Sequence, residues 1–123
     1  MANTLRQALI NAGIKRENKG AISTLGAVLG QDGPAVAIVF NPWYIYEPEA
    51  QAKVRQIVGD DFYILPSSTE EVLCVSKTDN DVSDLLQMVK EINRGLVDGQ
   101  GVYIADDVYE VKGKMIVSAI EAR

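Results

Sequence analysis

The sequence contains no histidine and only one cysteine, and both scarcities limit the chemistry that it can perform. Without histidine there is no Ser-His-Asp or Cys-His nucleophile, no histidine general base and no histidine ligand for a metal. The single thiol, Cys74, cannot form a disulfide within the chain, which fits a reducing cytoplasm. Because Cys74 lies inside the apolar run Val72–Val75, we expect a buried core residue and not a nucleophile.

Long apolar runs are missing too. The longest, Ala35–Phe40, is far shorter than the roughly 20 residues of a membrane-spanning helix. The segment Met1–Ile10 carries one arginine and no apolar stretch of the signal-peptide kind, so it is typical of a mature protein and not of a signal peptide. With 123 residues, of which 47% are hydrophobic and 24% charged, the chain can bury a core, and we expect one domain over residues 1–123.

Basic residues are scarce outside the first twenty positions. Residues 1–20 hold four basic side chains and one acidic, whereas the rest of the chain holds eight basic and sixteen acidic, giving a net charge of −5. An acidic body repels phosphate backbones, so direct nucleic-acid binding is disfavoured. The acidic side chains either only keep the protein in solution or form a face that attracts a basic partner.

Three helices are predicted from capping residues and apolar spacing. Asn3 or Thr4 caps a short helix that runs to Ala12, and Pro48 suits the first position of a second helix. Asp81 caps a third, longer helix. The expected buried stripes are Leu5, Ala8, Leu9 and Ala12; Ala50, Val54, Ile57 and Val58; and Val82, Leu85, Leu86, Val89 and Ile92.

Extended segments lie in pairs between these helices. They are Ala21–Gly30 and Ala35–Phe40, joined by a turn at Gln31–Pro34; Phe62–Leu65 and Glu71–Ser76; and Gly101–Ile104, Val108–Val111 and Lys114–Ala119. The order is therefore α-β-β-α-β-β-α-β-β. It predicts an α+β fold whose sheet is antiparallel or mixed, with the helices packed on one face.

A turn is predicted at Pro66, Ser67 and Ser68, just before the strand that begins at Glu71. The residue before a proline favours an extended backbone, and serine hydroxyls bond nearby backbone amides. We expect this segment to reverse the chain between two adjacent antiparallel strands.

Carboxylates provide the remaining candidates for chemistry. Asp106 and Asp107 are neighbours, but neighbours in an extended chain point to opposite faces and cannot form an acid–base pair by themselves. A pair drawn from Asp106 and Glu70 or Glu71 across the fold stays open as an alternative. The acidic residues from Asp79 onward lack the glycine and the closing glutamate of a calcium loop. We therefore expect no metal and no cofactor.

The aromatic segment Trp43–Tyr46 is the most suggestive feature. If it is extended after Pro42, Trp43 and Ile45 share one face while Tyr44 and Tyr46 share the other. Tyrosine and tryptophan often anchor protein interfaces. Trp43, Tyr44 and Tyr46 are therefore candidates for a partner or homo-oligomer contact, the alternative being local packing over a sheet edge.

Three motifs in the second half of the chain resemble an uncharacterised bacterial family found mostly in gut anaerobes. Residues 62–72 are similar to its Y-x-L-P-S-S-x-H-E-V pattern, residues 89–93 to V-x-x-V-N, and residues 104–109 to L-S-D-x-V-Y. Glu70 replaces the motif histidine and Ala105 replaces the motif serine. The family's members are usually longer, so the resemblance implies its C-terminal module alone. It implies a fold and an origin, and no activity.

These observations favour a non-enzymatic binding or regulatory module that acts through protein–protein contact. One alternative is a phage or mobile-element inhibitor of a host defence system, acting as an acidic mimic of nucleic acid or as a protein blocker. The other alternative is a hydrolase or transferase that uses carboxylates and hydroxyls. No membrane partner is expected.

Overall fold

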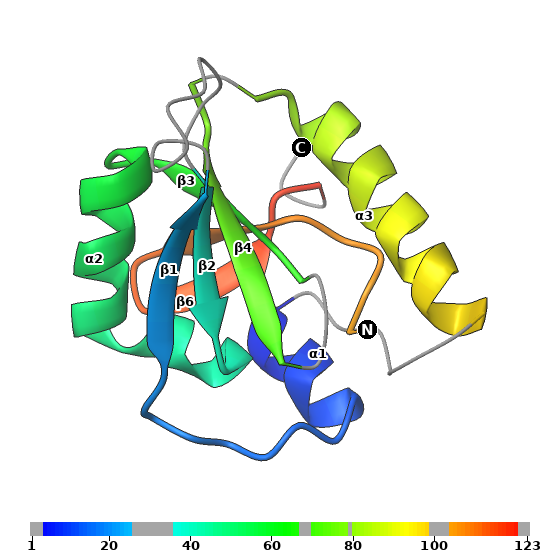
Figure 1. Ribbon diagram of the computed structural model, residues 1–123, viewed down its shortest axis with the longest axis horizontal. Helices are drawn as coiled ribbons and strands as arrows, with labels where there is room; N and C mark the ends of the chain where they lie inside the picture. Colours follow the sequence, from blue (N-terminus) through cyan, green and yellow to red (C-terminus); the bar gives the residue numbers. More distant parts are fainter. Residues whose placement is uncertain (1–3, 26–35, 67–69, 79, 99–103, 121–123) are drawn as a thin grey trace.

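The computed structural model describes residues 4–25, 36–66, 70–78, 80–98 and 104–120. Within these residues the chain forms three α-helices, a 3-10 helix and a six-stranded antiparallel sheet (Figure 1). The elements are α1 (Leu5–Asn11), β1 (Ala21–Leu25), β2 (Val36–Phe40), η2 (Pro42–Tyr46), α2 (Pro48–Val58), β3 (Phe62–Leu65), β4 (Glu71–Ser76), α3 (Val82–Asp98), β5 (Tyr109–Lys112) and β6 (Met115–Ser118). The predicted α+β class and the order of helices and strand pairs are confirmed.

The helices begin where the local sequence predicts. The Thr4 hydroxyl accepts a hydrogen bond from the backbone N–H of Gln7 at 3.1 Å and so caps α1. Pro48 is the first residue of α2. The Asp81 carboxylate accepts from the N–H of Ser83 at 3.4 Å at the start of α3. Short polar side chains and a proline therefore set these boundaries without help from distant residues.

The sheet has the strand order β1-β2-β4-β3-β5-β6, and every neighbouring pair is antiparallel. Strands β3 and β4 are adjacent, with Leu65 opposite Leu73. The chain reversal predicted around Pro66 is thus confirmed, and Pro66 itself is buried. The hydrogen bonds expected of Ser67 and Ser68 lie outside the described residues. The same holds for the turn at Gln31–Pro34.

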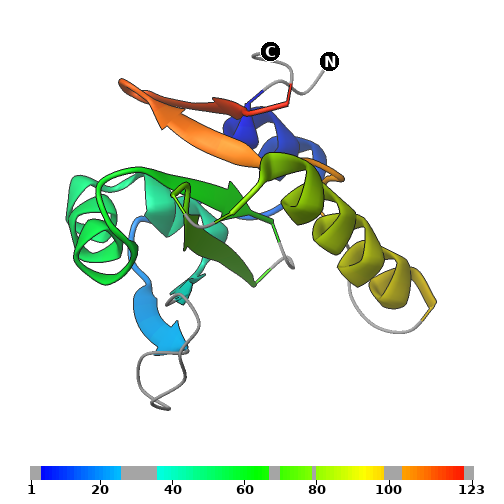
Figure 2. The same ribbon diagram turned by 90° about the horizontal axis from the view of Figure 1, so that it is seen from above.

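Helices cover both faces of the sheet, so the prediction that they share one face is wrong. The face toward α1, η2 and α2 carries Ala37, Val39, Ile64, Val72 and Cys74, all fully buried. The opposite face meets α3 through Val36, Tyr63, Leu65, Leu73 and Val75. Figures 1 and 2 show α2 and α3 on opposite sides of β4. Strands that are apolar at successive positions are suited to burial on both faces, which explains the arrangement.

The predicted stripe of α3 is largely confirmed. Val82, Leu85 and Val89 are buried, and Leu86 is half-buried. The side chain of Ile92 lies outside the described residues. Of the strand predicted over Gly101–Ile104 only Ile104 is described, and it belongs to no strand.

The first helix lies beside the last hairpin. Thr4 forms an isolated antiparallel bridge with Val117 of β6, and α1 packs against the β5–β6 hairpin (Figure 2). Segments from nearly opposite ends of the sequence therefore meet on the side of the sheet that also carries η2. This meeting point is where the candidate site lies.

Candidate binding pocket

The aromatic segment forms the 3-10 helix η2, so the prediction of an extended segment is wrong. Asn41 has a left-handed backbone conformation (φ 70°), and its side-chain oxygen accepts from the N–H of Trp43 at 3.2 Å. Pro42 occupies the first helical position, where its missing N–H costs nothing. Side chains in a 3-10 helix do not alternate between two faces, so the predicted pairing of Tyr44 with Tyr46 on one face does not apply. Tyr44, a candidate for a partner or homo-oligomer contact, is buried with 4% of its surface exposed.

Asn41 also holds the loop that precedes β1, residues 15–20, which is called the basic loop because it contains Lys15, Arg16 and Lys19. Its side-chain amide donates to the carbonyl oxygens of Glu17 and Lys19 at 2.9 and 2.8 Å. The indole N–H of Trp43 donates to the Ile14 carbonyl at 3.0 Å. These bonds keep the loop against η2. The Arg16 guanidinium consequently lies over the Trp43 ring, 5.3 Å from its centroid.

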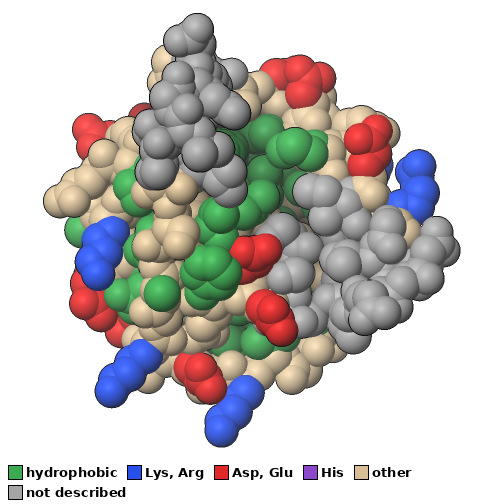
Figure 3. All heavy atoms as spheres, viewed as in Figure 1, with side chains coloured by type: hydrophobic (Ala, Val, Ile, Leu, Met, Phe, Trp, Pro, Cys, Tyr) green, Lys and Arg blue, Asp and Glu red, His purple; other side chains and the backbone are tan. Residues whose placement is uncertain are grey.

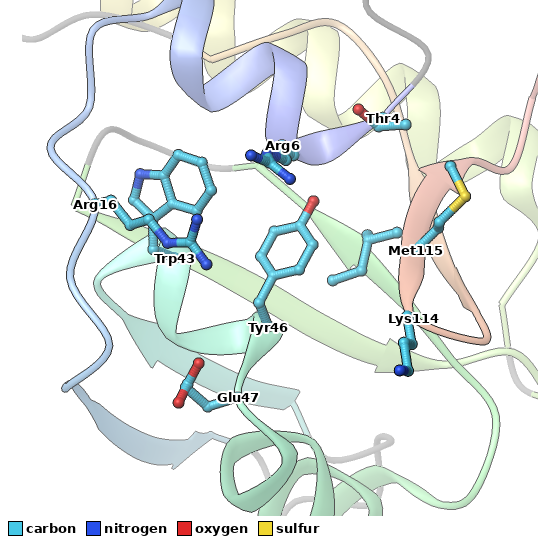
Figure 4. Close-up of a pocket in the computed structure, with 9 residues that line it drawn as sticks. Thr4, Arg6, Arg16, Trp43, Tyr46, Glu47, Lys114 and Met115 are labelled. Carbon is cyan, nitrogen blue, oxygen red and sulfur yellow. The ribbon is translucent and has the colours of Figure 1, made fainter.

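A pocket of about 440 Å³ opens between α1, the basic loop, η2 and the β5–β6 hairpin (Figure 4). This volume falls within the range of small-ligand sites. The Trp43 and Tyr46 rings form one wall, with centroids 5.8 Å apart and planes tilted by 37°. Its lining residues are Thr4, Arg6, Arg16, Trp43, Tyr46, Glu47, Lys114, Met115 and Ile116.

The pocket is positively charged within an acidic protein. Arg6, Arg16 and Lys114 line it against one carboxylate, Glu47. None of the three cations forms an ion pair within the part of the chain that the structure describes. Unpaired cations that share one cavity concentrate positive potential there and attract anions.

The hydroxyl of Tyr46 is buried in this pocket and has no hydrogen-bond partner among the described residues. In Figure 4 it points toward Arg6. Burial raises the pKa of Tyr46 from its ordinary 10.0 to about 12. The backbone N–H of Arg6 and the charges of Arg6 and Arg16 act in the opposite direction, although that N–H does not reach hydrogen-bond geometry. The phenol therefore stays protonated at neutral pH and has a proton to donate.

The family of unknown function DUF5688 matches residues 43–111, which is more than half of the chain. The chain belongs to DUF5688. All three of the sequence motifs, within residues 62–72, 89–93 and 104–109, fall inside the matched segment, which also includes η2. No curated protein and no solved structure matches the chain.

The DUF5688 segment supplies only part of the pocket. Trp43, Tyr46 and Glu47 lie within it, whereas all three cations lie outside it, in the first twenty residues and at Lys114. Sequence reasoning noticed the excess of basic residues in positions 1–20 but did not connect it with the aromatic segment. Nothing in the sequence indicated that the β5–β6 hairpin places Lys114 in the same cavity.

The acidic candidates lie outside the lining of this pocket. Glu70 is exposed, and Glu71 begins β4 opposite Phe40. Asp106 is exposed. Asp107 is half-buried, and its carboxylate accepts from the Ser118 hydroxyl at 2.7 Å and from the N–H of Val108 at 2.8 Å, which ties the start of β5 to β6.

The described residues contain no group of three or more His, Cys, Asp and Glu side chains that could hold a metal ion. None of the helices there combines the length and the apolar character that crossing a bilayer requires.

A second surface feature is an apolar area over β2 and β4, on the face that α3 covers in part (Figure 3). Phe40 is 40% exposed there, and Ile38 and Leu73 are half-buried. These three side chains share a face through the pairing of β2 with β4. Hydrophobic residues exposed next to one another in this way are compatible with contact to another protein.

Proposed function

We propose that this DUF5688 protein is a non-catalytic binding module that holds an anionic group of a protein partner in the pocket between α1, η2 and the β5–β6 hairpin. One observation carries the proposal. Arg6, Arg16 and Lys114, which form no ion pair with another described residue, line one cavity of an otherwise acidic protein. Clusters of this kind recognise phosphorylated and acidic motifs in other proteins.

The mouth of the pocket supports a protein partner. Met115 lines the pocket and is 55% exposed. Methionine adapts its shape to different apolar surfaces and is frequent at binding surfaces. A partner can therefore place an anionic group among the cations and an apolar side chain on Met115.

The polar side chains of the pocket also support binding over catalysis. Arg6, Arg16 and Lys114 offer hydrogen-bond donors and positive charge. Cationic donors of this kind stabilise an anion but do not abstract a proton. Glu47 is the one lining carboxylate, without a second acid to complete a pair.

The test compares two double variants with the same change in net charge. Arg16→Glu with Lys114→Glu reverses the charge of the pocket. Lys53→Glu with Lys90→Glu reverses two exposed lysines on α2 and α3 instead. Each tagged protein is used to capture proteins from a lysate of its source cell, with quantitative mass spectrometry as the readout.

We expect a specific protein that the wild type and the α2–α3 control capture and that the pocket variant loses. Circular dichroism melts of all three proteins check that the variants are folded. If the folded pocket variant captures the same proteins in the same amounts as the control, the pocket is not the binding site and the proposal is wrong.

A further inference from the structure

We propose that the anionic group is the dianionic phosphate of a phosphorylated side chain on the partner protein, an inference that rests on the proposed function. The charge of the pocket is the first argument. Arg6, Arg16 and Lys114 against Glu47 leave two positive charges in excess. A phosphate monoester carries about −1.5 to −2 at pH 7, whereas a carboxylate carries only −1. Phosphate therefore matches this excess and a single carboxylate does not.

The arrangement of the arginines is the second argument. The guanidinium carbon of Arg16 lies over the Trp43 ring, 5.3 Å from the ring centroid. The N–H groups of this guanidinium form no hydrogen bond to another described residue, and the same is true of Arg6. Guanidinium edges bind phosphate oxygens through paired hydrogen bonds. The hydroxyl of Tyr46, to which no described residue is hydrogen-bonded, adds a donor on the same wall.

The aromatic wall argues against a nucleotide. Trp43 is only 5% exposed and Arg16 lies over its ring, so a base has no free indole face on which to stack. The acidic charge of the rest of the chain argues against polyanions, since RNA and anionic membranes present many charges that such a body repels. A single phosphate on a protein avoids that repulsion.

The chain offers its own reporter for a test. Trp43 is its single tryptophan and lines the pocket, so intrinsic fluorescence follows occupancy directly. The probes are N-acetyl-phosphoserine-N-methylamide, the corresponding glutamate derivative, inorganic phosphate, and phosphatidylcholine vesicles containing phosphatidic acid. We expect saturable binding of the phosphoserine probe, and weaker binding of the other three.

Variants locate the site. Arg6→Gln and Arg16→Gln should each weaken phosphoserine binding about tenfold or more, because each removes charge-assisted hydrogen bonds. Glu47→Gln should strengthen it, because it removes a negative charge from the lining. Lys53→Gln on the exposed surface of α2 is the matched control and should change nothing. Calorimetry replaces fluorescence for the Arg16 variant, since Arg16 itself contacts Trp43.

The pH dependence separates phosphate from carboxylate recognition. The second pKa of a phosphate monoester is about 6, so lowering the pH from 7.5 to 5 leaves about a tenth of it dianionic and should weaken binding about tenfold. The protein contains no histidine, whose ordinary pKa falls in this range, so the change reports the ionisation of the ligand.

Each other outcome overturns this inference in a distinguishable way. If the glutamate probe binds as well as phosphoserine, without pH dependence, the phosphate inference fails while the proposed function stands. Equal binding of inorganic phosphate or of the vesicles shows that the phosphate does not come from a protein. If the phosphoserine probe gives no saturable signal at millimolar concentration, the phosphate inference fails, and the capture experiment with the charge-reversed variants decides the proposed function separately.

Discussion

Replacing Tyr46 by phenylalanine should stabilise the protein. The variant keeps the ring that packs at 5.8 Å from Trp43 and removes only the hydroxyl, which is buried and lacks a hydrogen-bond partner among the described residues. A buried hydroxyl without a partner costs about 1–3 kcal/mol of folding free energy. The small void left by one oxygen atom offsets part of this gain, so we expect a net stabilisation of about 1 kcal/mol.

For a domain of this size, 1 kcal/mol corresponds to a rise of about 3–5 °C in the melting temperature. Urea unfolding followed by circular dichroism measures the same difference as a free energy. Tyr63→Phe is the matched control, because Tyr63 lies half-buried on the opposite face of the sheet and its hydroxyl is not among the buried atoms without partners. We expect that control to change stability by less than about 0.5 kcal/mol. A loss of stability in Tyr46→Phe would refute the reasoning, since it would mean that the hydroxyl is bonded.

The same variant has a signature at alkaline pH. Burial raises the pKa of Tyr46 to about 12, so the folded state holds the phenol proton more tightly than the unfolded state does. This contribution to stability is complete below pH 10, the ordinary pKa, and is lost as the pH rises from 10 to 12. Tyr46→Phe cannot lose it, so the advantage of the variant over the wild type should grow across that interval. A constant difference would show that burial does not perturb this phenol.

Three further predictions follow from packing. Gly20→Ala should cost several kcal/mol in urea unfolding, because its Cβ would overlap the Phe40 carbonyl oxygen; Gly59→Ala, whose Cβ meets open space, should cost only about 1–3 kcal/mol from its backbone conformation (φ 107°). Cys74 is fully buried and burial raises the pKa of its thiol, so a thiol reagent should label it only as the protein unfolds; rapid labelling of folded protein would contradict this. Leu85→Ala should lower the free energy of unfolding by about 2–5 kcal/mol, and the half-buried Leu86→Ala should lower it clearly less. The reverse order in urea unfolding would contradict the orientation of α3 on the sheet.

Local sequence signals predicted the elements well because their causes are local. Thr4, Pro48 and Asp81 begin helices through contacts within a few residues. It was harder to predict which faces of the sheet the helices cover, although the strands carried a signal. Both Phe62–Leu65 and Glu71–Ser76 are apolar at consecutive positions, which favours a sheet covered on both sides. The prediction that the helices share one face rested on the order of the elements and did not use this pattern.

The pocket was not predictable because its residues are brought together by the tertiary structure. The turn at Asn41–Pro42 depends on a left-handed residue that is bonded to a loop more than twenty positions earlier. Periodicity describes regular segments and carries no information on such contacts. Arg6 and Lys114 line the same pocket because α1 packs on the last hairpin, and Arg16 does so because its loop is bonded to Asn41 and Trp43. Trp43 and Tyr46 were selected as candidates for the wrong geometry, and a role for them in binding stays a prediction.

The closure of α1 on β6 has a consequence for the timing of any interaction. The bridge between Thr4 and Val117 joins positions separated by nearly the whole chain, so it forms only when both segments are present. During synthesis β6 is also the last of these elements to leave the ribosome. A partner that needs Arg6 and Lys114 together therefore ignores nascent and partly folded chains and selects finished molecules. Once bound, it would link the first helix to the last hairpin and protect that junction from local opening.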